Sequence, residues 1–289
     1  MNKFVINWLL FIVLSLIWGS SFILMKIGLQ QLSPYQVAAV RVVSSGLILL
    51  PVTLKYISDI PAKKLLLVFL SGSIGSLIPG FLFCIAEEKI DSSLAGTLNS
   101  LTPVFVIITG VVFFNVHTSS NKVIGIVIAF TGSILLLFSK PHLLVNQNFL
   151  SIFPVILATV LYGFNVNMVS KKLLHIPSLH ITAIALTFNA IPALFVLIFT
   201  GYFSMPLTNI KILTSTGASV ILGIAGTAIA TVLFYILVKR ASVLFASMVT
   251  YAIPFVAIFW GVFYGESFGL QQVFCMLIIL AGVYFTNKI

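Results

Sequence analysis

The feature that most constrains this chain is a succession of long apolar runs separated by short breaks. A helix that spans a bilayer needs about 20 predominantly apolar residues, and the runs here have about that length. They are apolar all round and show no period-2 alternation, which predicts helices and not barrel strands. The predicted spans cover residues 5–27, 34–54, 64–86, 92–115, 121–138, 149–170, 178–200, 212–238, 242–263 and 270–287.

Composition excludes a soluble fold. Of the 289 residues, 60% are hydrophobic and 7% are charged, whereas soluble domains contain about 45–50% apolar and about 25% charged residues. The spans and their loops leave these residues no room for a nucleotide-hydrolysing motor, and the chain lacks a G-x-x-x-x-G-K-[ST] motif. The sequence therefore predicts an all-α membrane protein with ten transmembrane helices.

The net charge of +10 sets the predicted orientation. Lys and Arg residues stand singly or in pairs at the ends of the apolar runs, so we interpret them as topology signals and expect no nucleic-acid partner. With a cytoplasmic N-terminus, ten basic residues fall inside and four outside, which follows the positive-inside rule. We expect a multi-pass protein of the inner (plasma) membrane with both termini in the cytoplasm.

The chain also repeats itself. At an offset of 151 residues the third and fourth spans align with the eighth and ninth, and at an offset of 144 the first aligns with the sixth. The sequence thus divides into two halves of five spans, residues 1–145 and 146–289. Five is odd, so the two halves must face opposite sides of the membrane, an arrangement typical of secondary transporters with a central cavity near the midplane. The matched pairs are Gly72 with Gly223, Gly75 with Gly226, Pro103 with Pro254, and Trp18-Gly19 with Tyr162-Gly163.

Three features together resemble the EamA-type branch of the drug/metabolite transporter superfamily: the stretch from Trp18 to Phe22, the Pro103 and Pro254 helices, and Gly265-Glu266. The resemblance implies a ten-helix carrier of small metabolites, commonly outward, with the last helix of each half at the periphery. One position departs from the family pattern. The acid after the fourth helix of a repeat is present as Glu266, but its first-half counterpart is Asn115.

Polar and aromatic residues at membrane depth are the candidate substrate-binding groups, because lipid offers no hydrogen-bond partners. Trp18 and Tyr162 each lie about thirteen residues into a span, near the midplane at 1.5 Å per residue. They could form an aromatic cavity wall or simply pack the halves together. Ser21 is also a candidate, because it lies three residues after Trp18 in the same predicted span. Asn165 lies one turn from Tyr162, although amides of this kind more often join helices.

Two kinked helices are expected to line the cavity. Asn99 lies four residues before Pro103, and Tyr251, three residues before Pro254, repeats the arrangement in the ninth span. A proline there removes a backbone donor and frees carbonyls of the preceding turn, which predicts a local opening. The alternative is a kink satisfied by neighbouring hydroxyls, without any role in ligand binding.

Arg41 is the one basic residue in the interior of a predicted span, away from the span's ends. It could snorkel to the outer headgroups or pair with a substrate carboxylate or phosphate. Glu87, Glu88 and Asp91 cluster at the outer edge of spans three and four, where they are either solvated or able to relay a proton. We expect no catalytic site, metal or cofactor, because the four histidines, His117, His142, His175 and His180, form no metal-ligand or catalytic pattern.

The sequence therefore favours a secondary transporter that exports a small polar or amphipathic metabolite, such as an amino acid or related compound, by alternating access. A coupled proton or other ion is a further candidate partner. A membrane-embedded enzyme acting on a lipid-linked substrate and a scaffold without translocation remain the alternatives.

Overall fold

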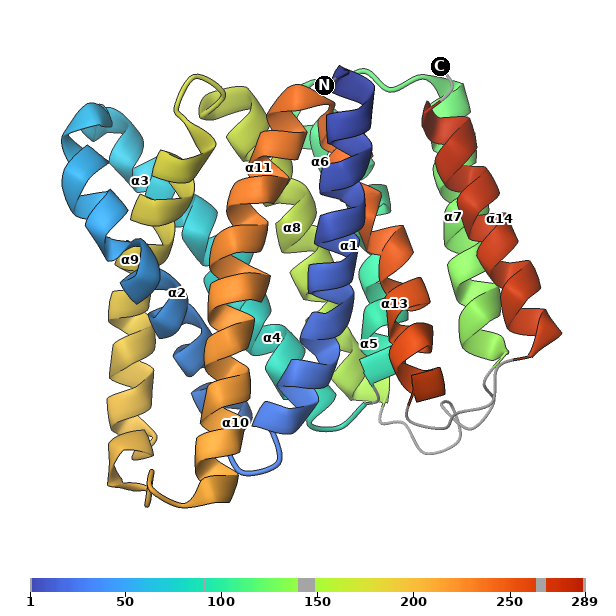
Figure 1. Ribbon diagram of the computed structural model, residues 1–289. Helices are drawn as coiled ribbons and strands as arrows, with labels where there is room; N and C mark the ends of the chain where they lie inside the picture. The colour runs from blue at the N-terminus through green and yellow to red at the C-terminus, as the bar shows by residue number, and fades with distance from the viewer. Residues whose placement is uncertain (1, 91, 140–148, 264–268, 288–289) are drawn as a thin grey trace.

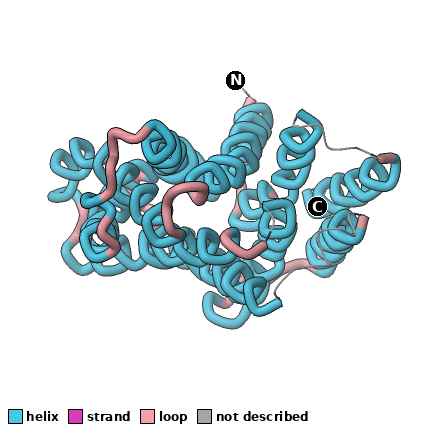
Figure 2. Tube along the Cα trace, turned by 90° about the horizontal axis from the view of Figure 1, so that it is seen from below, coloured by secondary structure: helices cyan, strands magenta, loops and turns pink. Residues whose placement is uncertain are grey.

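A computed structural model describes residues 2–90, 92–139, 149–263 and 269–287. Four positions discussed above lie outside the described residues: Asp91, His142, Gly265 and Glu266. The described chain is all-helical and contains no strand, as Figure 2 shows from below. The all-α prediction is confirmed.

Seven helical segments are long and apolar enough to cross a membrane: Lys3–Gly28, Pro34–Asp59, Ala62–Glu87, Leu94–Phe114, Leu150–Lys172, Ser178–Phe199 and Ile210–Arg240. Shorter apolar helices lie at Ser120–Leu136, Val243–Val256 and Leu270–Thr286, where the remaining three spans are predicted. These seven segments and three shorter helices are those found within residues 2–90, 92–139, 149–263 and 269–287. That these three helices also cross the membrane stays a prediction.

The long spans are built from the helices α1 (Lys3–Gly28), α2 (Pro34–Tyr56), α3 (Ala62–Gly72), α4 (Ile78–Glu87), α5 (Ser92–Leu98), α6 (Thr102–Phe114), α8 (Phe153–Lys172), α9 (Ser178–Phe199), α10 (Ile210–Ile221) and α11 (Ala230–Arg240). The shorter helices are α7 (Ser120–Phe138), α12 (Val243–Ser247), α13 (Val249–Phe263) and α14 (Leu270–Asn287).

Local sequence explains where several helices begin and bend. Ser33 and Gln36 form a capping box at the start of α2, with Pro34 in the first turn. Between α5 and α6 the helix tightens into a 3₁₀ turn, η3 (Asn99–Leu101), directly before Pro103. The missing N–H of Pro103 explains why the ordinary helical ladder stops there.

Two π-helical segments interrupt the third and eighth predicted spans. The segment η2 (Ser73–Leu77) joins α3 to α4, and η7 (Leu222–Ile229) joins α10 to α11. Adding the offset of 151 residues places η2 on residues 224–228, inside η7. Such π-helical turns are rare and occur frequently at functional sites, so this pair marks a part of the bundle that helix propensity alone would not produce.

The helices pack side by side in one bundle (Figure 1). Extensive packing occurs between α2 and α9, between α6 and α8, and between α1 and α13. Helices that are far apart in the sequence therefore lie against each other. The helices α7 and α14 pack on each other at one side. Gly125 and Gly282 permit their close approach, because a Cβ at Gly282 would lie 2.6 Å from the carbonyl oxygen of Gly125.

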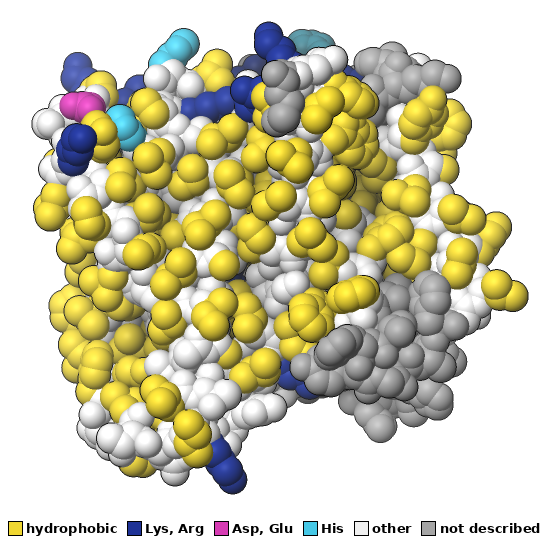
Figure 3. Space-filling view, in the orientation of Figure 1, with side chains coloured by type: hydrophobic (Ala, Val, Ile, Leu, Met, Phe, Trp, Pro, Cys, Tyr) yellow, Lys and Arg dark blue, Asp and Glu magenta, His cyan; other side chains and the backbone are white. Residues whose placement is uncertain are grey.

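Most charged side chains on the visible face lie at one end of the bundle. In Figure 3 hydrophobic side chains cover most of the visible face, while Lys and Arg gather at the end where α1 begins. The end of α14 reaches the same end of the bundle in Figure 1. Large apolar side chains such as Leu47 of α2 and Phe195 of α9 are exposed, as expected for a surface that faces lipid.

Candidate functional site

A cavity of about 90 Å³ lies in the interior of the bundle. Its wall is built by residues from α1, α2, η2, α4, η3, α6, α8, η7, α11, α12 and α13. Six of the seven residues predicted to bind substrate line it: Trp18, Ser21, Arg41, Asn99, Tyr162 and Asn165. Their role in binding stays a prediction, but residues chosen from separate parts of the sequence meet at one place.

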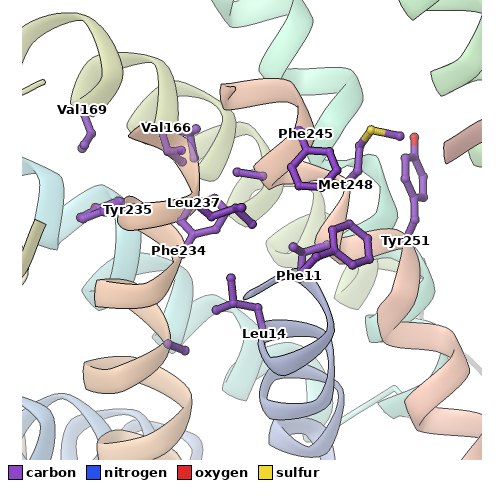
Figure 4. Packing of buried hydrophobic residues seen from close by; sticks show 14 of the residues in the cluster. Phe11, Leu14, Val166, Val169, Phe234, Tyr235, Leu237, Phe245, Met248 and Tyr251 are labelled. Carbon is purple, nitrogen blue, oxygen red and sulfur yellow. The ribbon is translucent and has the colours of Figure 1, made fainter. Parts of the chain in front are cut away.

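Two apolar clusters flank the cavity along α1. Phe11 and Leu14 belong to the first cluster, which Figure 4 shows, where Phe11 packs against Phe245 at a ring-centroid distance of 5.6 Å. Phe22 belongs to the second cluster and packs edge-on against Phe83 at 6.0 Å. Trp18 contacts both clusters. The cavity therefore lies where the two apolar clusters meet, and residues of both clusters form part of its wall.

The indole of Trp18 is held in a fixed position. Its Nε1–H donates to the carbonyl oxygen of Gly226 at 3.0 Å, and its ring packs against Phe234 at 5.1 Å. Gly226 lies in the π-helical segment η7, where wider turns change the pairing of backbone carbonyls. Tyr162, from α8, instead stacks on Phe83 at 6.1 Å. Both rings thus form part of an aromatic wall around the cavity.

Two polar side chains one turn beyond these aromatics cover the glycines of the π-helical segments. A Cβ at Gly226 would lie 2.7 Å from Oγ of Ser21, and a Cβ at Gly75 would lie 2.8 Å from Cγ of Asn165. Asn165 donates to the hydroxyl of Tyr235 at 3.0 Å, while its Oδ1 is buried without a hydrogen-bond partner. Glycine at these two positions leaves room for the side chains of Ser21 and Asn165.

Arg41 is buried, with 8% of its surface exposed, and points into the cavity. Its Nε donates to Oγ1 of Thr227 at 2.6 Å, and that hydroxyl lies 3.3 Å from the carbonyl oxygen of Leu222. Arg41 is thus held inside the bundle, where α2 packs against η7, and its role in binding stays a prediction. Within the described ranges Arg41 forms no ion pair.

Asn99 lies at the break between α5 and α6, as the proline predicts. Its Oδ1 accepts from Oγ1 of Thr102 at 3.2 Å, while the neighbouring Ser100 hydroxyl is buried without a partner. In the matching region, Thr250 also lines the cavity four residues before Pro254, and its hydroxyl donates to the carbonyl oxygen of Ser247 at 2.9 Å. Both proline-containing helices therefore contribute hydroxyl or amide groups to the wall.

Tyr251 does not line the cavity. It is fully buried and donates its hydroxyl to the carbonyl oxygen of Ile126 in α7, 3.2 Å away. Figure 4 shows it at the edge of the first apolar cluster. The prediction for Tyr251 is corrected because successive residues of a helix differ by about 100° in direction, which turns Thr250 and not Tyr251 toward the cavity.

The acidic cluster is only partly solvated. Glu88 is exposed, but Glu87 is half-buried at the end of α4. Oε2 of Glu87 accepts from the hydroxyl of Ser92 at 3.0 Å, and Oε1 is buried without a partner. Glu87 is not among the residues that line the cavity.

Several cavity residues were not anticipated from the sequence, among them Ser76, Thr102, Thr231, Phe234, Tyr235 and Ser247. The glycine pairs pointed to η2, which contains Ser76, and to η7, which precedes Thr231. A helix that is apolar all round gives no signal for which of its faces points inward. Within the described part of the chain, no three His, Cys, Asp or Glu side chains lie close enough to hold a metal ion.

With this geometry established, comparison with known proteins gives the family. The sequence model of the EamA-like transporter family matches residues 6–138 and again residues 149–288. The chain belongs to this family. The resemblance seen in the sequence is confirmed, and the chain is a multi-pass membrane protein of a transporter family.

Curated relatives agree with this EamA-like assignment over nearly the whole chain. An uncharacterized transporter of Archaeoglobus fulgidus is 26% identical, with 96% of this chain and 97% of the relative aligned. Protein PagO of Salmonella typhimurium is 23% identical over 96% of this chain and 91% of its own length. A solved crystal structure has a TM-score of 0.74 at 17% identity, covering 96% of this chain and 95% of the other, which supports the fold.

Proposed function

We propose that this EamA-like protein is a secondary transporter that exports a small polar or amphipathic metabolite, such as an amino acid or related compound. The observation that carries the proposal is the cavity itself, whose mostly apolar wall also holds polar side chains such as Arg41, Asn99 and Asn165 and is lined from both halves of the chain. Buried polar side chains are costly in a membrane unless they face water, a ligand or other protein groups. A carrier needs such a chamber, and a scaffold does not.

Alternating access is the proposed mechanism, with residues 1–145 and 146–289 as two inverted halves of five spans. Contacts that recur at the sequence offsets support it. A Cβ at Gly19 would lie 2.8 Å from Cγ1 of Val256, and one at Gly163 would lie 2.7 Å from the carbonyl carbon of Phe105. Gly163 follows Gly19 by 144 residues and Val256 follows Phe105 by 151. Such paired contacts support the proposal that the two halves are equivalent.

The two π-helical segments are the proposed points of flexing. They occupy matching positions, border the cavity through Gly75 and Gly226, and interrupt otherwise continuous helices. Rocking of one half against the other requires a few residues that absorb the change in backbone angles. Segments with altered hydrogen bonding beside the cavity meet that need.

We further propose the plasma membrane as the location, with both termini in the cytoplasm. The Lys- and Arg-rich end of the bundle, which holds the start of α1 and the end of α14, would then be cytoplasmic. Transport would be driven by the substrate gradient or by a coupled ion such as a proton.

Reconstitution in liposomes tests the function. Purified protein would be assayed with labelled amino acids, amines, nucleosides, sugars and organic acids, against protein-free liposomes. Time-dependent, saturable accumulation of at least one class is expected. Chemical conversion of an added lipid-linked compound would instead favour the enzyme alternative, and the absence of both would favour a scaffold.

A further inference from the structure

The charge of the cavity wall limits what the cavity can hold. Arg41 is the charged residue in that wall, and no Asp or Glu lines the cavity among the residues described. Taking a charged side chain into a low-dielectric interior is expensive unless another group compensates it. The described wall therefore carries one positive charge and no carboxylate of its own.

The hydrogen bonds of Arg41 leave the far end of its guanidinium unused. Nε donates to Thr227, and no hydrogen bond of the two Nη atoms occurs within the described part of the chain. A guanidinium presents five N–H donors in a fixed planar fork. Thr227 thus fixes the orientation of the side chain through one donor, while the pair of nitrogens that recognises anions stays available.

No carboxylate among the described residues forms an ion pair with Arg41, although Glu87 lies within electrostatic range. Glu87, on α4, feels the charge of Arg41 and that of Lys26 from α1. It nevertheless forms no ion pair with either in the described structure, and its Oε2 is engaged by Ser92 of α5. Cys84 and Tyr162, the other titratable groups that feel Arg41, are uncharged donors of weak acidity.

We propose that the cavity binds a small anion whose carboxylate or phosphate group pairs with the Nη nitrogens of Arg41. This inference rests on the proposed transport function and narrows its substrate class from polar metabolites in general, amino acids included, to small anions. Two parallel N–H···O bonds from a guanidinium to a carboxylate or phosphate are stronger than bonds between neutral groups and are specific in direction. The remainder of the ligand would contact Trp18 and Tyr162 and the wall hydroxyls.

Size and sign narrow the class further. The cavity of about 90 Å³ is compatible with a small compound. A cationic ligand would meet the repulsion of Arg41 although aromatic rings are present, and the ammonium group of a zwitterion would find no carboxylate in the wall.

Thermal-shift binding with size-matched probes tests this inference on purified full-length protein. Lactate and glycerol 3-phosphate represent the two anionic groups, alanine the zwitterion, ethanolamine the cation and glycerol the neutral compound. A ligand that binds only the folded state raises the apparent melting temperature by mass action. We expect the shift to be largest for lactate or glycerol 3-phosphate, smaller for alanine and absent for ethanolamine and glycerol.

The variants Arg41→Gln and Arg240→Gln form a matched pair, because Arg240 is exposed at the end of α11 and carries the same side chain. Loss of a charge-assisted hydrogen bond worth about 1.5 kcal/mol or more predicts at least about tenfold weaker anion binding by Arg41→Gln. Arg240→Gln should bind as the wild type does. Arg41→Lys, which keeps the charge, serves as the second variant and should retain partial binding if Arg41→Gln does not fold.

Anion binding that survives in Arg41→Gln, or a larger shift with ethanolamine than with lactate, would overturn the inference. So would the absence of a shift with every probe. The liposome assay with the broad panel remains an independent test of transport, since uptake of a neutral or cationic compound would uphold the proposed function while this inference fails.

Discussion

Trp18 and Gly226 are joined by a hydrogen bond of 3.0 Å from the indole Nε1 to the backbone carbonyl oxygen, although 208 residues separate them in the chain. The bond links α1 to the π-helical segment η7 at the wall of the cavity. It therefore attaches a cavity-lining aromatic ring of α1 to η7, the segment whose backbone is proposed to flex. Movement of η7 would therefore be transmitted directly to the position of Trp18.

Trp18→Phe should weaken the protein and alter transport together. Phenylalanine keeps a ring against Phe234 but cannot donate to Gly226, so a loss of about 1 kcal/mol in the free energy of unfolding is expected. Uptake in liposomes and melting temperature measure the two effects. Trp260→Phe is the control, because it removes the bond from the Trp260 indole to Ser20 at 2.9 Å, outside the cavity wall. Equal effects of both variants on substrate affinity would contradict a cavity role for Trp18.

Gly223→Ala should be strongly destabilising. A Cβ at this position would overlap Oγ of Ser44 and the backbone carbonyl of Arg41, so α2 and η7 would have to separate. Overpacking of this kind costs about 1–3 kcal/mol. Gly217→Ala, in the preceding helix α10, is the matched control because no atom lies within 4 Å of its added Cβ. It should be neutral or stabilising by up to about 1 kcal/mol. Melting temperatures that do not differ between the two variants would count against the close packing of α2 on η7.

Asn165 and Tyr235 should be energetically coupled. Their hydrogen bond of 3.0 Å joins α8 to α11 next to the cavity. A double-mutant cycle with Asn165→Ala and Tyr235→Phe is expected to give a coupling energy of about 0.6 kcal/mol, within the range measured between membrane helices. Unfolding of the four proteins in detergent measures it. Strict additivity would show that the two side chains do not interact in the folded protein.

The helical fold was predictable because the apolar runs are long and because glycine and proline recur at fixed offsets. The pairs Gly72 with Gly223 and Gly75 with Gly226 identified elements that lie in close contact with other helices. That the corresponding segments are π-helical was not predictable, since the glycines permit close contact without specifying the hydrogen-bond pattern.

Side-chain direction limited the prediction of the site. In a span that is apolar all round, the sequence does not show which face points inward, which is why Tyr251 was placed in the wall and Thr250 was not. The burial of Arg41 was equally undecided, because it depends on whether α2 meets lipid or another helix at that depth. Packing of α2 against η7 decides it.

Access to the cavity from the two sides of the membrane tests the central claim most directly. Cys84 and Cys275, both buried, would be replaced, and Ser247→Cys would place one thiol in the cavity wall. A membrane-impermeant thiol reagent would be added to right-side-out and to inside-out vesicles. Alternating access predicts labelling of Cys introduced at position 247 from both sides, slowed by transported substrate. Labelling from one side only, or from neither, would contradict a carrier that opens its central cavity to each side in turn.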